Sequence, residues 1–236
     1  MKVIITEQQF DQLVMSERVG FILSESYGNI DNLKKQIRKL LLTGVTLASI
    51  ILAINNLHLK DIEKQALIEK AKQEEMALKA KQDSIFNVKV DACTKYMEKA
   101  LKNQGYNRNS TKLNPESLVK KAEKYNFDLP LLIAAAHYES CFGATPRARK
   151  TNSTFSVGAY DSGKNMVTYK HPDDSIDGYI RLINNDYLIN GKTIKDLLKP
   201  GGFVNKNGDR YASRKNYEKT LNSIRNKIIS QYPELV

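Results

Sequence analysis

The chain has 236 residues, is 41% hydrophobic, contains two cysteines and carries a formal net charge of +11. This length supplies one globular domain with appended segments and excludes two large domains. Most of the excess positive charge lies in residues 105–236, but no familiar nucleic-acid motif or concentrated basic block accompanies it, so we expect an anionic partner other than nucleic acid.

Residues 1–57 are expected to form an N-terminal segment for assembly or anchoring, whose main feature is the uncharged apolar run 40–54. The run is shorter than the roughly 20 residues that span a bilayer, yet it is too apolar for an ordinary surface helix. Two interpretations are open: a signal-anchor with membrane contact through 40–54, or a buried helix that packs against partner subunits. A cleavable signal peptide fits poorly, because a long polar segment precedes the run.

Residues 58–104 predict a charged helical spacer. The stretch 59–101 contains neither Pro nor Gly, and its acidic and basic residues are closely mixed. Its apolar residues form only a thin, broken stripe, which indicates a long solvated helix with at most weak coiled-coil association.

Residues 105–236 begin with a second apolar helix that ends in a single acid. The run 129–136 is apolar, Pro130 lies in its first turn and Asp128 is a suitable N-cap. Glu139 closes the run, and an acid in such surroundings should have a raised pKa that keeps a proton available for donation. The alternative is a helix-terminal acid that points into solvent.

A polar, glycine-containing stretch at 151–163 and the alternating residues 166–169 predict a β-hairpin after this helix. A buried helix followed by a small hairpin lobe would form a cleft with Glu139 at its edge. Amphipathic patterns at 175–183 and 217–229 predict further helices. The expected fold is therefore mainly α: an α+β domain with a small β-hairpin lobe, preceded by the long helix and the apolar helical segment.

Four pieces of this domain match one family motif in order. They are Glu-Ser-Cys-Phe-Gly at 139–143, Asn-Ser-Thr-Phe-Ser-Val-Gly at 152–158, Tyr169 with 174–179, and Tyr211-Ala212-Ser213 with Asn216-Tyr217. Residues 112–230 thus resemble the lysozyme-like glucosaminidases of glycoside hydrolase family 73. Two positions depart from the family pattern: Cys141 replaces a glycine, and Ser213-Arg214 replaces Thr-Asp.

The resemblance implies an endo-β-N-acetylglucosaminidase that hydrolyses β-1,4 bonds in peptidoglycan glycan strands, with Glu139 as general acid. Glycoside hydrolysis usually needs a second carboxylate. Asp161, Asp173 and Asp174 are the candidates, and Asp161 ranks first because it lies in the expected hairpin, although a turn residue explains it equally well. Tyr211 matches the family tyrosine that lines the cleft and is needed for activity; its alternative is a core tyrosine.

Sugar stacking must come from Tyr or Phe, because the chain has no Trp. The available platforms, each with core packing as its alternative, are Tyr138, Phe155, Tyr160, Tyr169 and Tyr211.

Three other functions compete with a hydrolase. A lytic transglycosylase or muramidase of the same superfamily shares the Glu-Ser step, but the Gly-Leu-Met-Gln sequence typical of transglycosylases is absent. A non-catalytic virion structural protein could retain the fold. A cysteine hydrolase using His137 and Cys141 is disfavoured, because Cys141 would lie at the unfavourable end of the helix dipole. We expect both cysteines to be free, and the three histidines show no ligand spacing, so we expect no metal and no cofactor.

Residues 1–10 resemble the N-termini of structural proteins from tailed bacteriophages. Together with the hydrolase resemblance, this predicts a virion-associated lysin that opens the host cell wall in the periplasm and contacts other virion proteins through 1–104. The alternative location is a membrane-anchored enzyme whose catalytic domain is exported.

Overall fold

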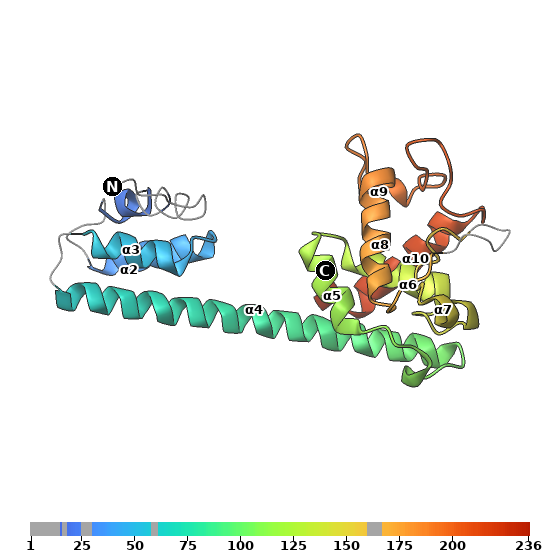
Figure 1. The fold of residues 1–236 in the computed structure, drawn as a ribbon, viewed down its shortest axis with the longest axis horizontal. Coiled ribbons are helices and arrows are strands. Elements are labelled where there is room, and N and C mark those ends of the chain that lie inside the picture. Colours follow the sequence, from blue (N-terminus) through green and yellow to red (C-terminus); the bar gives the residue numbers. More distant parts are fainter. Residues whose placement is uncertain (1–14, 16–17, 25–29, 58–60, 160–166) are drawn as a thin grey trace, which may run out of the picture. The chain divides into compact units, whose positions relative to one another are not determined.

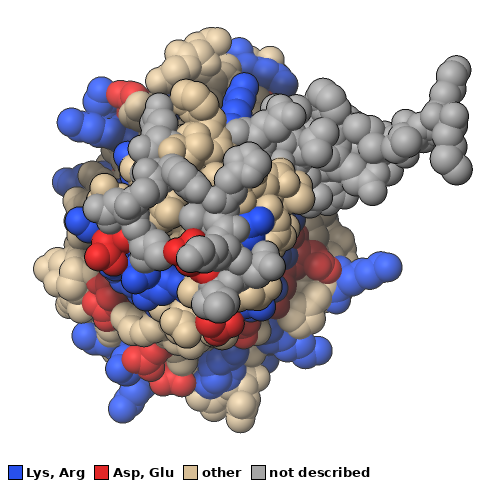
Figure 2. All heavy atoms as spheres, turned by 90° about the vertical axis from the view of Figure 1, so that its left-hand side faces the viewer, with Lys and Arg blue, Asp and Glu red and all other residues tan. Residues whose placement is uncertain are grey.

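A computed structural model describes residues 15, 18–24, 30–57, 61–159 and 167–236 (Figure 1). The chain is mainly helical, as predicted, and divides into two compact units, Met1–Ile85 and Phe86–Val236. We refer to them as the N-terminal and C-terminal units. On the face shown in Figure 2, Lys and Arg side chains are interspersed with Asp and Glu.

In the N-terminal unit, the apolar run 40–54 is divided between two helices, α2 (Ile30–Leu42) and α3 (Leu47–Asn55). Gly44 occupies a left-handed conformation in the turn between them, with φ +85°. The side chain of Thr46 then caps α3 by accepting a hydrogen bond from the Ser49 amide at 3.3 Å. The run therefore does not form the single helix that its composition suggested.

One face of α3 is covered by the same chain, while Ala48 and Leu52 on the helix are exposed. Ile50, Ala53 and Ile54 belong to a core shared with α2 and with the first part of α4 (Asp61–Asn103). The buried members of this core are Val19, Leu23, Leu33, Ile37, Leu40, Ile50, Ala53, Ile54, Leu57, Leu67, Ile68 and Ala71. Among the helices of the described residues, none is long and apolar enough to cross a membrane.

Helix α4 occupies the predicted spacer, but only in its middle are all of its side chains exposed. Its N-terminal part contributes Leu67 and Ala71 to the core of the N-terminal unit, and its C-terminal part contributes Tyr96 and Met97 to the core of the C-terminal unit. Residues 79–85 are all exposed. The spacer is thus part of both units, because apolar residues recur near each end of the helix.

The C-terminal unit is built around α6 (Leu129–Ser140), in which every residue from Leu129 to Ala136 is buried. Helices α5 and α10 pack against α6 (Figure 1). The other elements of the unit are η1 (Arg108–Ser110), α5 (Pro115–Lys124), α7 (Pro146–Thr151), α8 (Asp174–Leu182), η2 (Ile183–Tyr187), α9 (Ile194–Leu197), α10 (Tyr217–Gln231) and η3 (Pro233–Leu235).

The predicted β-hairpin is not confirmed. The described residues contain one isolated β-bridge, between Val204 and Arg210, and no paired strand. The chain nevertheless folds back, since the Val167 amide donates to the Val157 carbonyl at 3.1 Å and the Tyr169 amide to the Thr151 carbonyl at 2.9 Å.

The described residues of the predicted hairpin do not form a regular strand, because Asn152 and Ser156 adopt left-handed conformations with φ 51° and 53°. The predicted hairpin residues 160–166 lie outside the described part of the chain.

Candidate active site

Helix α6 places Glu139 one residue before its end. The Asp128 carboxylate accepts a hydrogen bond from the Leu131 amide at 2.7 Å, which confirms the predicted N-cap. The residues after the helix, 141–143, all have positive φ: 49° at Cys141, 59° at Phe142 and 81° at Gly143. This left-handed turn reverses the chain immediately after the Glu-Ser step.

Ser140 ties the loop after the helix to the end of α6. Its hydroxyl donates to the Thr154 carbonyl at 2.6 Å and accepts from the Gly143 amide at 2.7 Å. The loop residue Ser156 is in turn hydrogen-bonded to the Glu139 side chain. Glu139 therefore supplies a titratable acid, and the next residue, Ser140, holds the loop that contacts this acid.

Glu139 is half-buried, and its carboxyl Oε1 accepts a hydrogen bond from the Tyr217 hydroxyl at 2.8 Å. Burial raises the pKa of Glu139 from 4.5 to about 6, while the hydrogen bonds from Tyr217 and Ser156 and the charge of Arg214 lower it. The predicted raised pKa is confirmed, and its cause is the withdrawal of the carboxyl from water.

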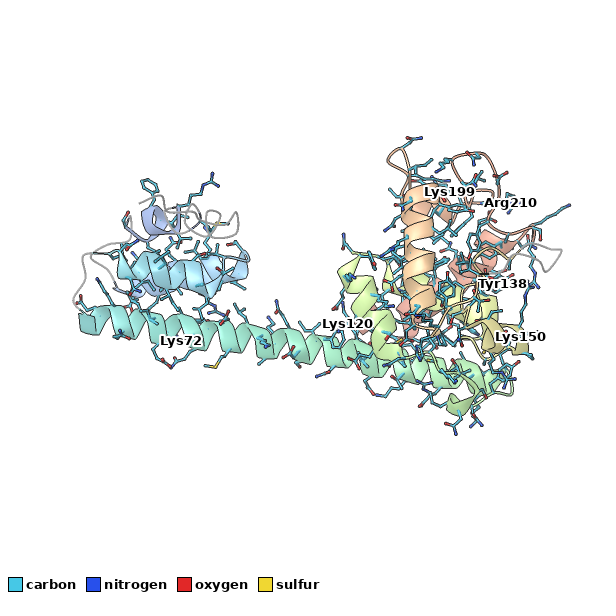
Figure 3. The ribbon with its side chains drawn as sticks, in the orientation of Figure 1. Lys72, Lys120, Tyr138, Lys150, Lys199 and Arg210 are labelled. Carbon is cyan, nitrogen blue, oxygen red and sulfur yellow. The ribbon has the colours of Figure 1, made fainter. Side chains whose placement is uncertain are left out.

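Glu139 opens onto a cleft of about 500 Å³. The residues that line this cleft are Tyr138, Glu139, Arg147, Ser156, Ala159, Arg210, Tyr211, Ala212, Ser213, Arg214 and Tyr217. Figure 3 labels Tyr138 on α6 and Arg210 in the segment before α10. Three of the residues predicted from the sequence, Tyr138, Glu139 and Tyr211, are thus brought together.

Tyr211 lines the cleft with its ring, but its hydroxyl donates to the Phe155 carbonyl at 2.7 Å. The ring also lies 5.6 Å from that of Tyr217. Because the hydroxyl is occupied by backbone, Tyr211 holds the segment that leads to Ser156 and supplies an aromatic wall. This contact does not present the hydroxyl as a proton donor for chemistry in the cleft.

Two predicted stacking platforms lie elsewhere. Phe155 is fully buried and stacked on Tyr179, with ring centroids 4.5 Å apart, so its assignment as a sugar platform is corrected to core packing. Tyr169 does not line the cleft and packs on α8: a Cβ added at Gly178 would lie 2.3 Å from the Tyr169 hydroxyl. Tyr160 and the predicted second carboxylate, Asp161, lie outside the described residues.

Glu139 is the single carboxylate among the described residues that line the cleft. The candidates Asp173 and Asp174 serve local structure: Asp173 accepts from the Asn114 amide at 2.9 Å and the Ser117 hydroxyl at 2.8 Å, and Asp174 accepts from the His171 amide at 3.1 Å. Neither lines the cleft.

Sequence reasoning assigned no role at the site to Arg147, Ser156, Arg210, Arg214 or Tyr217. Tyr217 and Ser156 lie in matched pieces of the motif, which was the available signal for them, and Arg214 stands at a position that departs from the motif. Arg147 lies on α7, on an exposed turn with no distinguishing pattern, so its position in the cleft appears only in three dimensions.

The cysteine–histidine alternative gains no support. Burial raises the pKa of the Cys141 thiol to about 11, which disfavours the reactive thiolate. The His137 Nδ1 lies 2.8 Å from the Tyr96 hydroxyl, and burial lowers the pKa of the imidazole. Both cysteines are free, as predicted, and no cluster of three potential metal ligands occurs in the described part of the chain.

Replacing Glu139 by Gln is expected to stabilise the fold at pH 8. The folded pKa of about 6 lies above 4.5, so this carboxyl's contribution to stability is fully present below pH 4.5 and is lost as pH rises through 6. The loss corresponds to roughly 1–2 kcal/mol. We expect the free energy of unfolding of Glu139→Gln, measured with denaturant, to exceed that of wild type at pH 8 and to match it at pH 4. Equal values at both pH would contradict a pKa that burial raises by more than the hydrogen bonds and Arg214 lower it.

No protein-family model, no curated protein and no solved structure matches this chain.

Proposed function

We propose that this chain hydrolyses the β-1,4 glycosidic bonds of peptidoglycan, as an endo-β-N-acetylglucosaminidase, with Glu139 as the general acid. The observation that carries the proposal is a half-buried carboxyl with a pKa of about 6 that faces a cleft with aromatic walls. Protonation of the glycosidic oxygen assists its departure, and an acid with this pKa is still protonated in part near neutral pH.

Tyr217 and Tyr138 have complementary roles in this proposal. Tyr217 is buried and its hydroxyl fixes Glu139 by donating to Oε1, which orients the carboxyl toward the bound sugar. Tyr138 is half-buried at the cleft wall, so part of its ring is accessible for stacking on a sugar face.

The water-activating carboxylate stays a prediction from the sequence. Asp161 follows the cleft residue Ala159 by two positions, and we retain it as the first candidate. Asp161→Asn should reduce turnover without removing binding if it activates water.

One observation favours a second candidate function. Because Glu139 is the single carboxylate in the described cleft lining, one acid–base residue could act alone, with the sugar's own 6-hydroxyl attacking in place of water. That reaction is the lytic transglycosylase alternative, and it differs from hydrolysis in its product.

The test is product analysis of purified peptidoglycan treated with the full chain. N-acetylglucosamine at the new reducing ends supports the proposal, N-acetylmuramic acid would indicate a muramidase, and 1,6-anhydro ends would indicate a transglycosylase. A folded wild-type protein that releases no product would replace the proposal by a non-catalytic virion structural role. The virion setting, the contacts through 1–104 and the membrane contact through 40–54 stay predictions. Residues 1–10, from which the virion setting was predicted, lie outside the described part of the chain.

The pH dependence of the reaction should respond to Tyr217. Its hydrogen bond lowers the pKa of Glu139, so Tyr217→Phe should raise that pKa above about 6. A general acid is inactive once it ionises, and the alkaline limb of kcat/KM should therefore move to higher pH by roughly half a unit to one unit. Tyr125→Phe is the matched control, because the Tyr125 hydroxyl donates to Asp177 outside the cleft and its loss should leave the limb in place. An unchanged limb in Tyr217→Phe would exclude Glu139 as the titrating acid.

A further inference from the structure

Three arginines line the cleft, and they differ in their ionic partners. Arg210 is paired with the buried carboxylate of Glu218, to which its Nη2 donates at 2.9 Å and 3.0 Å. Arg147 and Arg214 are both exposed, and neither has a carboxylate within ion-pair distance among the described residues. Their charges are therefore available to a ligand.

Arg214 is also held in place before any ligand binds. Its Nη1 donates to the Tyr138 hydroxyl at 3.3 Å, and its guanidinium carbon lies 5.8 Å from the centre of the Tyr138 ring. A planar guanidinium that is restrained against an aromatic side chain loses less freedom when it binds an anion. Glu139 is the single acidic residue in the described lining of the cleft, against three arginines, so the lining favours an anionic ligand.

We propose that Arg147 and Arg214 form a carboxylate subsite beside Glu139, which binds the free lactyl carboxylate of a muramic acid that bears no stem peptide. This inference rests on the proposed function and names its substrate more closely. Arginine matches a carboxylate in planar, bidentate geometry. A cleft of about 500 Å³ has the size of a small-ligand site, and a sugar that carries its anion on a directly attached group fits a site of this size.

The lactyl group satisfies this requirement in one chemical state. When a stem peptide is attached, the lactyl carboxyl is an amide and has no charge, and the peptide's own carboxylates lie farther from the sugar. When the amide is hydrolysed, each muramic acid carries a free carboxylate. The reaction class that supplies the preferred substrate is therefore amide hydrolysis at the lactyl group.

The test measures binding, so that it does not depend on turnover. Full-length Glu139→Gln is titrated with three ligands: the glucosaminyl-muramic acid disaccharide, the same disaccharide with a dipeptide on its lactyl group, and neutral chitobiose. We expect the free acid to bind most tightly, and addition of Arg147→Gln or Arg214→Gln to weaken its binding by about tenfold each, because a hydrogen-bonded ion pair is lost. Chitobiose binding should not change.

Arg149→Gln is the matched control, since Arg149 is exposed on the same short helix as Arg147 but does not line the cleft. It removes the same charge and should leave all three affinities unchanged. Melting temperatures establish that each variant is folded.

Three results would overturn the subsite: no loss of affinity in the arginine variants, an equal loss for chitobiose, or an arginine-dependent loss that is confined to the dipeptide ligand. The last result would mean that the arginines bind a carboxylate of the stem peptide and not the lactyl carboxylate. The proposed function is judged separately. If the arginine variants weaken binding but the wild type releases no product, the carboxylate subsite is supported and the proposed hydrolase activity is excluded. If the wild type cleaves peptidoglycan but does not discriminate between the ligands, the hydrolase activity is supported and the subsite is excluded.

Discussion

Glu139→Gln should reduce the rate of peptidoglycan cleavage by about a thousandfold. Glutamine retains the size of the side chain and can still accept the 2.8 Å hydrogen bond from Tyr217, but it cannot deliver a proton to the leaving oxygen. The measurement is the initial rate of reducing-end release from purified peptidoglycan at pH 6. The substitution is expected to leave stability unchanged at pH 4 and to raise it at pH 8, so unfolding would not account for the loss at pH 6.

Glu98→Gln is the control for this prediction. Glu98 is exposed on α4, lies within the C-terminal unit and does not line the cleft, so its replacement should leave the rate unchanged. If Glu139→Gln retained more than about a tenth of the wild-type rate, the contribution would lie below the range of a general acid, and Glu139 would not have that role.

Phe155→Ala should destabilise the C-terminal unit by about 4 kcal/mol, because it removes a fully buried aromatic ring and leaves a cavity. The ring of Phe155 stacks on Tyr179 at 4.5 Å, and both rings belong to the core around α6. The loss would also release the Phe155 carbonyl from its defined position opposite the Tyr211 hydroxyl. Denaturant unfolding monitored by circular dichroism measures the change in free energy.

Phe155→Leu separates packing from sugar stacking. It keeps most of the buried volume and should cost less than about 1.5 kcal/mol, although it removes the aromatic face. A Phe155→Ala variant with wild-type stability and weakened binding of glycan would restore Phe155 as a sugar platform and contradict its position in the core.

The features that the sequence predicted well are local ones. The N-cap at Asp128 and the apolar helix that follows it depend on residues within one helix and its first turn. Likewise, α4 follows from a long stretch without Pro or Gly. In each case the determining contacts lie within a few positions of one another, so a pattern along the chain is sufficient.

The features that escaped prediction depend on contacts between distant positions. Tyr217 reaches Glu139 across 78 positions, and Arg214 reaches Tyr138 across 76. Phe155 has the composition of a stacking platform, and only its enclosure by Tyr179 shows that it is core. The division of the run 40–54 depends on how α3 folds onto α2 and α4, which its hydrophobicity alone does not specify.

The left-handed turn at 141–143 restricts which residues can occupy position 141, close to Glu139. Cys141 is buried at 7% exposure while its backbone is left-handed, a conformation that glycine adopts without steric conflict. A change to glycine would relax the backbone but leave a void next to Phe142, whereas a β-branched residue would conflict with the backbone itself. Position 141 must therefore both adopt a left-handed backbone and fill a buried space. We expect related sequences to have small, unbranched side chains at position 141, whereas the exposed face of α4 should vary freely.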